Sequence, residues 1–179
     1  MKKIAIAILS ALSFGAFAAD YVSVDVDYAV DRAGSKDSTV QYIRAGKHFG
    51  DYLYRFQGRT ATLKNNSAIL SSVEATVENT TVKFAGIVPF VGVGHNNNAG
   101  YNYGVVGATY GLPVGPGYLL TGVKTRVGST QDVNRTKVTL GYAAYFIPVT
   151  KDVNFNLTVS RSVQDIKEDA YGIGLSFNF

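Results

Sequence analysis

The chain has 179 residues, a formal net charge of +4 and only 17% charged side chains, with no Cys, no Trp and a single Met. Without cysteine it holds no disulfide scaffold, Cys-based zinc site, iron–sulfur cluster or Cys nucleophile. The charged fraction is below the roughly 25% that is usual for soluble domains. Only the N-terminus holds a long apolar run, so no ordinary membrane-spanning helix follows it.

The N-terminal segment has the pattern of an export signal. Lys2 and Lys3 precede an apolar run over residues 4–17, which ends in Ala16-Phe17-Ala18. A basic end, a short apolar core and small residues at the cut predict a secretory signal peptide over residues 1–18, cleaved after Ala18. The run is too short for a membrane anchor. Cleavage removes two lysines and lowers the net charge to about +2, and no basic patch indicates a nucleic-acid partner.

Residues 19–179 then form one domain, in which apolar and polar residues alternate with the period of a β-strand. In the first segment Val22, Val24 and Val26 lie on one face, and Asp25 and Asp27 on the other. Tight hairpins are expected at 49–52, 78–81 and 149–152, and a Pro/Gly turn at 113–117 is expected to interrupt the strand ladder. The predicted strands cover residues 20–30, 39–49, 52–63, 68–78, 82–95, 101–112, 118–128, 135–147, 153–162 and 170–179.

Ten such segments suit strands of about 9–11 residues that cross a bilayer at a tilt. A sheet in lipid must pair every backbone polar group and therefore has to close. We predict an all-β, closed, antiparallel up-and-down transmembrane barrel of ten strands, or of eight if one strand has been divided near residues 64–67. An even strand number places both termini at the periplasmic end. Barrels of this kind carry a girdle of aromatic residues at each membrane interface. Because the chain has no Trp, Tyr and Phe must form these belts, and the candidates are Tyr52, Tyr54, Phe146, Tyr171 and Phe179.

The signal peptide, the stretch Pro89-Phe90-Val91-Gly92-Val93-Gly94 and the alternating end from Tyr171 to Phe179 resemble the small bacterial outer-membrane β-barrel family, with its opacity and OmpX/OmpA-type members. The resemblance implies a monomer in a Gram-negative cell outer membrane, in contact with outer-membrane lipid and lipopolysaccharide. It also implies a C-terminal signal for the barrel-assembly machinery, formed here by Tyr171, Ile173, Leu175, Phe177 and Phe179. The small members of the family have eight strands, whereas this sequence predicts ten.

If the apolar stripes face lipid, the charged residues between them face the lumen. The apolar stripe Val138, Leu140, Tyr142, Ala144 and Phe146 is then expected on the lipid side, and either Arg44 or Lys47 inside. Charges of both signs on neighbouring strands predict an ion-pair network that fills the lumen, because paired buried charges are tolerated. The alternative is a small diffusion pore. The expected lumenal charges are Asp25, Asp27, Arg55, Arg59, Glu74, Glu78, Lys124, Arg126, Arg135 and Lys137.

The two histidines are the first candidates for catalysis. His48 is expected to be an interfacial ring. His95 begins a faint likeness to the His-x-Ser-Asn pattern of outer-membrane lipid A 3-O-deacylases, but Asn97 stands where the nucleophilic Ser belongs.

Acidic clusters are the other candidates. Asp25 and Asp27 are compatible with an acid–base pair or a metal site, and Asp165, Glu168 and Asp169 with a calcium site that matches no established loop motif. We therefore expect no catalytic residue, metal or cofactor. The predicted function is a non-enzymatic structural or surface-interaction role, with a diffusion pore and then a lipid-modifying enzyme as alternatives.

Overall fold

The computed structural model describes residues 19–32, 37–63, 69–97, 100–129, 137–165 and 167–179. The predicted signal peptide and Arg135 lie outside these residues. Within the described ranges, no helix is long and apolar enough to cross a membrane.

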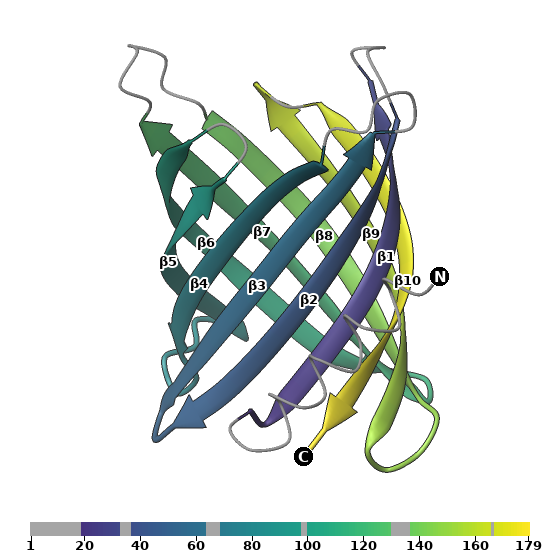
Figure 1. The fold of residues 1–179 in the computed structure, drawn as a ribbon. Coiled ribbons are helices and arrows are strands. Elements are labelled where there is room, and N and C mark those ends of the chain that lie inside the picture. The colour runs from purple at the N-terminus through teal and green to yellow at the C-terminus, as the bar shows by residue number, and fades with distance from the viewer. Residues whose placement is uncertain (1–18, 33–36, 64–68, 98–99, 130–136, 166) are drawn as a thin grey trace.

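Ten antiparallel strands form a closed barrel in which each strand pairs with its neighbours in sequence and β1 pairs with β10 (Figure 1). The ten-strand prediction is confirmed, because β3 and β4 are separate strands on either side of residues 64–68. The strands are β1 Tyr21–Asp31, β2 Ser38–Phe49, β3 Tyr52–Leu63, β4 Ile69–Asn79, β5 Ile87–Asn96, β6 Tyr101–Val114, β7 Gly117–Ser129, β8 Lys137–Pro148, β9 Val153–Gln164 and β10 Glu168–Asn178.

Two boundaries differ from the sequence-based expectation. β5 begins at Ile87 rather than at residue 82, because Ala85 and Gly86 adopt positive φ angles in a tight turn between Phe84 and Ile87. β6 continues through Pro113, which was expected to end it. Proline is tolerated at a sheet edge, and the pairing of β5 with β6 ends at Tyr110, so Pro113 has a partner on one side only.

The barrel has two distinct ends, which we call the turn end and the loop end. The turn end holds the short hairpins around Gly50, Gly115 and Thr150, together with Asp20 and the C-terminus, whose backbone hydrogen bonds join β1 to β2 and β10. The loop end holds the links after β1, β3, β5, β7 and β9. This arrangement places the two ends of the barrel sequence at the turn end (Figure 1).

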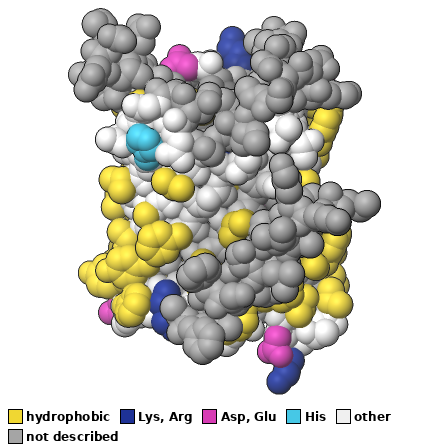
Figure 2. All heavy atoms as spheres, in the orientation of Figure 1, with side chains coloured by type: hydrophobic (Ala, Val, Ile, Leu, Met, Phe, Trp, Pro, Cys, Tyr) yellow, Lys and Arg dark blue, Asp and Glu magenta, His cyan; other side chains and the backbone are white. Residues whose placement is uncertain are grey.

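Many large apolar side chains are exposed on the outside of the barrel, and part of them can be seen between its two rims (Figure 2). On β10 the outward positions are Tyr171, Ile173, Leu175 and Phe177, and Ile173 is 56% exposed although it is apolar. An apolar surface of this extent is unusual on a soluble monomer. All five residues of the expected assembly signal therefore lie on or beside the outer face, with Phe179 just after the strand.

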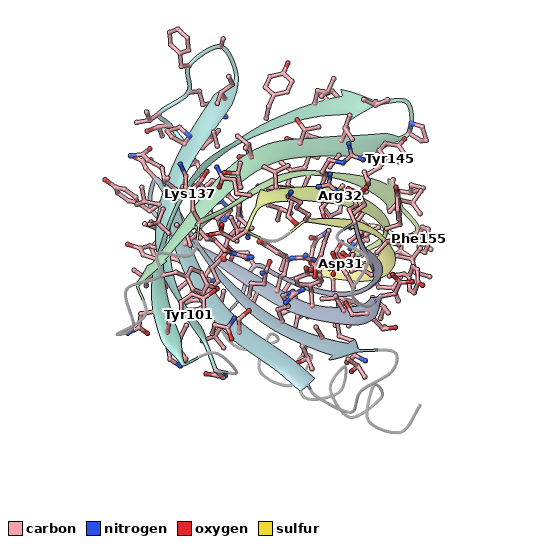
Figure 3. The ribbon with its side chains drawn as sticks, turned by 90° about the horizontal axis from the view of Figure 1, so that it is seen from above. Asp31, Arg32, Tyr101, Lys137, Tyr145 and Phe155 are labelled. Atoms are coloured by element: carbon pink, nitrogen blue, oxygen red, sulfur yellow. The ribbon has the colours of Figure 1, made fainter. Side chains whose placement is uncertain are left out.

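The orientation of β8 corrects the sequence prediction. Tyr142 pairs with Gly122 of β7 and Ser160 of β9, and these even-numbered positions line the interior. The stripe Val138, Leu140, Tyr142, Ala144 and Phe146 therefore faces the lumen, and Phe146 does not belong to an outer belt. The outward face of β8 is also rather apolar, with Ala143, Tyr145 and Ile147, so alternation of hydropathy could not decide between the two faces. Tyr145 lies outside the ring of strands (Figure 3).

Lys137 is wrongly assigned to the lumen for the same reason. It precedes Val138, which is buried, and its own side chain is exposed at the loop end of β8. Its backbone N–H donates to Asp165 Oδ2 over 2.5 Å. Lys137 is thus part of the rim.

Several lumenal tyrosines lie flat over glycines on the neighbouring strand. A side chain at these glycines would overlap the ring, so each Tyr–Gly pair fills space that two larger residues could not share. Such pairing of an aromatic ring with a strand glycine helps to fix the strand register. The pairs are Tyr21 over Gly46, Tyr101 over Gly128, Tyr103 over Gly94, Tyr118 over Gly111 and Tyr142 over Gly122.

Candidate functional site: a charged lumen and its cavity

The first cluster of lumenal charges is built around Asp25, which is 1% exposed. Its carboxylate pairs with the Arg44 guanidinium and accepts hydrogen bonds from Asn156 Nδ2 at 3.1 Å and Ser23 Oγ at 3.2 Å. Arg44 Nε in turn donates to Gln57 Oε1 at 3.1 Å. Four strands thus contribute to one network, which satisfies a carboxylate that would be costly to bury alone.

The second cluster is built around Glu74 of β4, which is also buried. Lys124 Nζ lies 2.6 Å from Glu74 Oε1, and Arg126 Nε donates to Glu74 Oε2 at 2.7 Å. Both cations come from β7, so the contact spans the two intervening strands. Those strands present Gly92 and Gly107 to the interior beneath it, where a larger residue would meet neighbouring atoms. The guanidinium of Arg126 also lies 5.5 Å from the centre of the Tyr103 ring.

Two further pairs lie nearer the ends of the lumen. At the turn end, Arg55 pairs with Glu78 over 2.7 Å. At the loop end, Arg59 lies 3.6 Å from Glu168. The ambiguity on β2 is resolved, because Arg44 faces inward whereas Lys47 points away from the lumen and pairs with Asp20 over 2.8 Å.

Asp27 differs from the other predicted lumenal acids. It is 4% exposed and accepts a hydrogen bond from Thr158 Oγ1 at 2.9 Å. Among the described residues it has no ion pair within 4.0 Å, whereas Asp25, Glu74 and Glu78 each have one. Asp25 and Asp27 do not join at a common partner, and no group of three potential metal ligands occurs in the described part of the chain.

A cavity of about 890 Å³ occupies the lumen from the turn end to the charged clusters. Its lining has two chemical faces. Carboxylates, amides and hydroxyls of β1, β9 and β10 form one side, including Asp27, Asn156 and Ser176, and apolar side chains of β7 and β8 form the other, including Leu120 and Phe146. Figure 3 looks at the barrel from above, the loop end, and shows side chains of several strands directed into the interior.

The loop end of the lumen is packed differently. Ala29, Val40, Ala61 and Ala170 form a buried apolar cluster against Tyr42, and neither these four residues nor Arg59 lines the cavity. Arg32 reaches from the end of β1 to the Ser162 carbonyl and lies 3.3 Å from Asp169. On the side formed by β10, β1, β2 and β3, the cavity lining therefore stops short of this cluster.

The residues considered for catalysis lie at the two rims. His95 Nδ1 is 2.7 Å from Asn102 Oδ1 on the outer face at the loop end, and Asn97 is exposed. Of the acidic cluster after β9, Asp169 pairs with Arg161 while Glu168 pairs with Arg59, so their carboxylates are directed to different partners.

His48 lies at the turn end, where β1 pairs with β2. Its Nδ1 and its backbone N–H both approach Asp20 Oδ2, at 2.8 Å and 2.6 Å. The Lys47 side chain and these contacts hold the pKa of the Asp20 carboxyl below its usual range. Asp20 lies just before β1, and its carbonyl accepts a hydrogen bond from the N–H of Phe179. The same residue therefore also binds the C-terminus.

The participation of neutral side chains in this network was not predicted from the sequence. Gln57, Asn156 and Thr158 each bond a lumenal charge or its partner. The polar stripe of β9 carried this signal, because Asn154, Asn156, Thr158 and Ser160 alternate with apolar residues. What alternation could not provide was the partner of each amide or hydroxyl on another strand.

A closed antiparallel barrel with an apolar outside and charged side chains inside has the architecture of a small transmembrane β-barrel. No protein-family model and no curated protein matches this sequence.

Solved structures of similar shape are bacterial outer-membrane barrels. Neisserial surface protein A shares 13% identity over 89% of this chain and 96% of its own, with a TM-score of 0.45. The KdgM porin shares 10% identity over 88% of this chain and 99% of its own, with a TM-score of 0.47. The N-terminal barrel domain of Pseudomonas aeruginosa OprF shares 12% identity over 90% of this chain and 98% of its own, with a TM-score of 0.39. At these values the likeness describes barrel shape and nothing about ligands.

Proposed function

We propose that this protein is a monomeric outer-membrane β-barrel with a structural or surface-interaction role, whose lumen is closed to free diffusion. The observation that carries the proposal is the buried apolar cluster at the loop end of β10, β1, β2 and β3, which does not line the cavity. A pore would need a continuous wet path, whereas here the Val40 cluster, Tyr42 and the Arg59–Glu168 pair narrow the described part of the lumen toward the loop end.

The outer-membrane assignment rests on the exposed apolar band and on closure of the sheet, since the bilayer leaves no unpaired sheet edge. The outward stripe of β10 is proposed to contact lipid and, during assembly, the barrel-assembly machinery. A non-enzymatic role is supported by the positions of His48 and His95, whose ring nitrogens lie beside Asp20 and Asn102 rather than a hydroxyl nucleophile within the described residues.

Planar-bilayer recording tests the closed lumen. We expect the purified wild-type barrel to give no large, steady conductance. The double variant Tyr42→Ala/Arg59→Ala should gain conductance, because it removes bulk and a charge from this narrower part of the lumen. A matched variant on the outer face, Tyr54→Ala, should stay silent. Large and steady wild-type currents would favour the diffusion-pore alternative instead.

A further inference from the structure

We propose that the lumenal cavity binds a small organic cation, a protonated amine on an apolar body, with the ammonium group held by Asp27. This inference goes beyond the structural role, because it assigns a ligand site to the inside of the barrel. It does not require the lumen to conduct.

The first support is the state of Asp27. Its carboxylate lines the cavity, is almost fully buried and receives one side-chain hydrogen bond, from Thr158. The other cavity-lining carboxylates, Asp25, Glu74 and Glu78, already pair with Arg or Lys. A buried carboxylate with no cation within 4.0 Å is costly to keep ionised, and a ligand ammonium would lower that cost.

The second support is the backbone around this carboxylate. Gly172 lies opposite Asp27, and a Cβ there would stand 2.6 Å from Thr158 Oγ1 and overlap the Asp27 carboxylate. The absence of a side chain at Gly172 thus lets Asp27 and Thr158 meet over the backbone of β10. The position of the Asp27 carboxylate is therefore fixed by the packing of β1 against β10 and β9.

The third support is the apolar surface beside the acid. Thr158 pairs with Ala144 of β8, which pairs with Leu120 of β7, and both line the cavity. The small Ala144 stands between Tyr142 and Phe146 on the same face. An amine bound at Asp27 would therefore lay its carbon skeleton over Ala144 and Leu120.

Size and charge agree with this ligand class. The volume of about 890 Å³ lies within the range of small-molecule pockets, roughly 300–1,000 Å³. Arg44, Arg55, Lys124 and Arg126 also line the cavity, but each pairs with a carboxylate. Among the described cations that line the cavity, Lys83 alone has no carboxylate within 4.0 Å, and it stands exposed at the turn end, away from Asp27.

Calorimetric titration of the barrel in lipid nanodiscs tests the proposal. The probes are 4-phenylbutylamine, the alcohol 4-phenylbutanol and the anion 4-phenylbutyrate, which share one apolar body. The variants are Asp27→Asn, Ala144→Phe to fill the apolar side, and Asp51→Asn as a control on an exposed turn outside the cavity lining. Heat-modifiable migration on gels shows which variants fold.

We expect saturable binding of the amine, with an affinity at least about tenfold above that of the alcohol, as a charged hydrogen bond provides. Asp27→Asn should remove this difference, Ala144→Phe should abolish binding of both, and Asp51→Asn should change neither. The proposal is overturned if wild type does not bind the amine saturably, if the alcohol or the anion binds as well, or if folded Asp27→Asn keeps the preference. If Asp27→Asn does not fold, the preference of wild type and the loss in Ala144→Phe decide.

Discussion

Replacing Glu74 by Gln is expected to destabilise the barrel by about 3–5 kcal/mol, the usual cost of leaving a buried ion pair without one partner. Lys124 and Arg126 both approach this carboxylate, and Lys124 is 8% exposed. The variant keeps the shape of the side chain and removes its charge, so two cations remain together inside the barrel. The free energy of unfolding in urea, measured in lipid vesicles, reports the loss.

Glu168→Gln is the matched control for this experiment. Glu168 lies 3.6 Å from Arg59 and its side chain is 33% exposed, so the same substitution should cost less than about 1 kcal/mol. The double variant Glu74→Gln/Lys124→Gln should recover part of the loss, because one excess buried charge is gone. Equal costs for Glu74→Gln and Glu168→Gln would show that the Glu74 cluster does not stabilise the interior.

Adding one methyl group at Gly174 is expected to destabilise the barrel by about 1–3 kcal/mol through overpacking. A Cβ at this position would stand 2.5 Å from the Val24 carbonyl oxygen and would overlap the Asp25 carboxylate. Neither the backbone of β1 nor a carboxylate held by Arg44 and Asn156 can easily move away. Urea unfolding of Gly174→Ala checks the prediction.

Gly141→Ala is the control, because no atom lies within 4 Å of its would-be Cβ on the outer face of β8. There the substitution should be neutral or slightly stabilising, since alanine loses less backbone freedom on folding than glycine. If the two alanine variants unfold at the same urea concentration, the fit of Asp25 over β10 does not contribute to stability.

The periodicity of the sequence determined the strands well, because a half-buried strand shows one face to lipid and the other to the lumen. It located β3 and β9 to within two residues and placed Asp25, Glu74 and Lys124 inside. It failed where both faces are apolar, as on β8, and so misplaced Phe146 and Lys137.

The periodicity of the sequence could not predict which lumenal charges pair with one another. Glu74 could in principle meet a cation on either neighbouring strand, and its actual partners come from β7 across two strands with inward glycines. Such contacts depend on barrel closure and on strand stagger, which are properties of the whole sheet. The cavity follows from the same cause, because it is the space that the paired charges and the other inward side chains leave unfilled.

We propose that the lumen is open at the turn end and closed toward the loop end. Because the chain has no cysteine, a single Ser160→Cys variant in the cavity can be probed with a membrane-impermeant thiol reagent applied from either side of oriented vesicles. The account predicts labelling from the turn side and protection from the loop side. Labelling at the same rate from the loop side would contradict it.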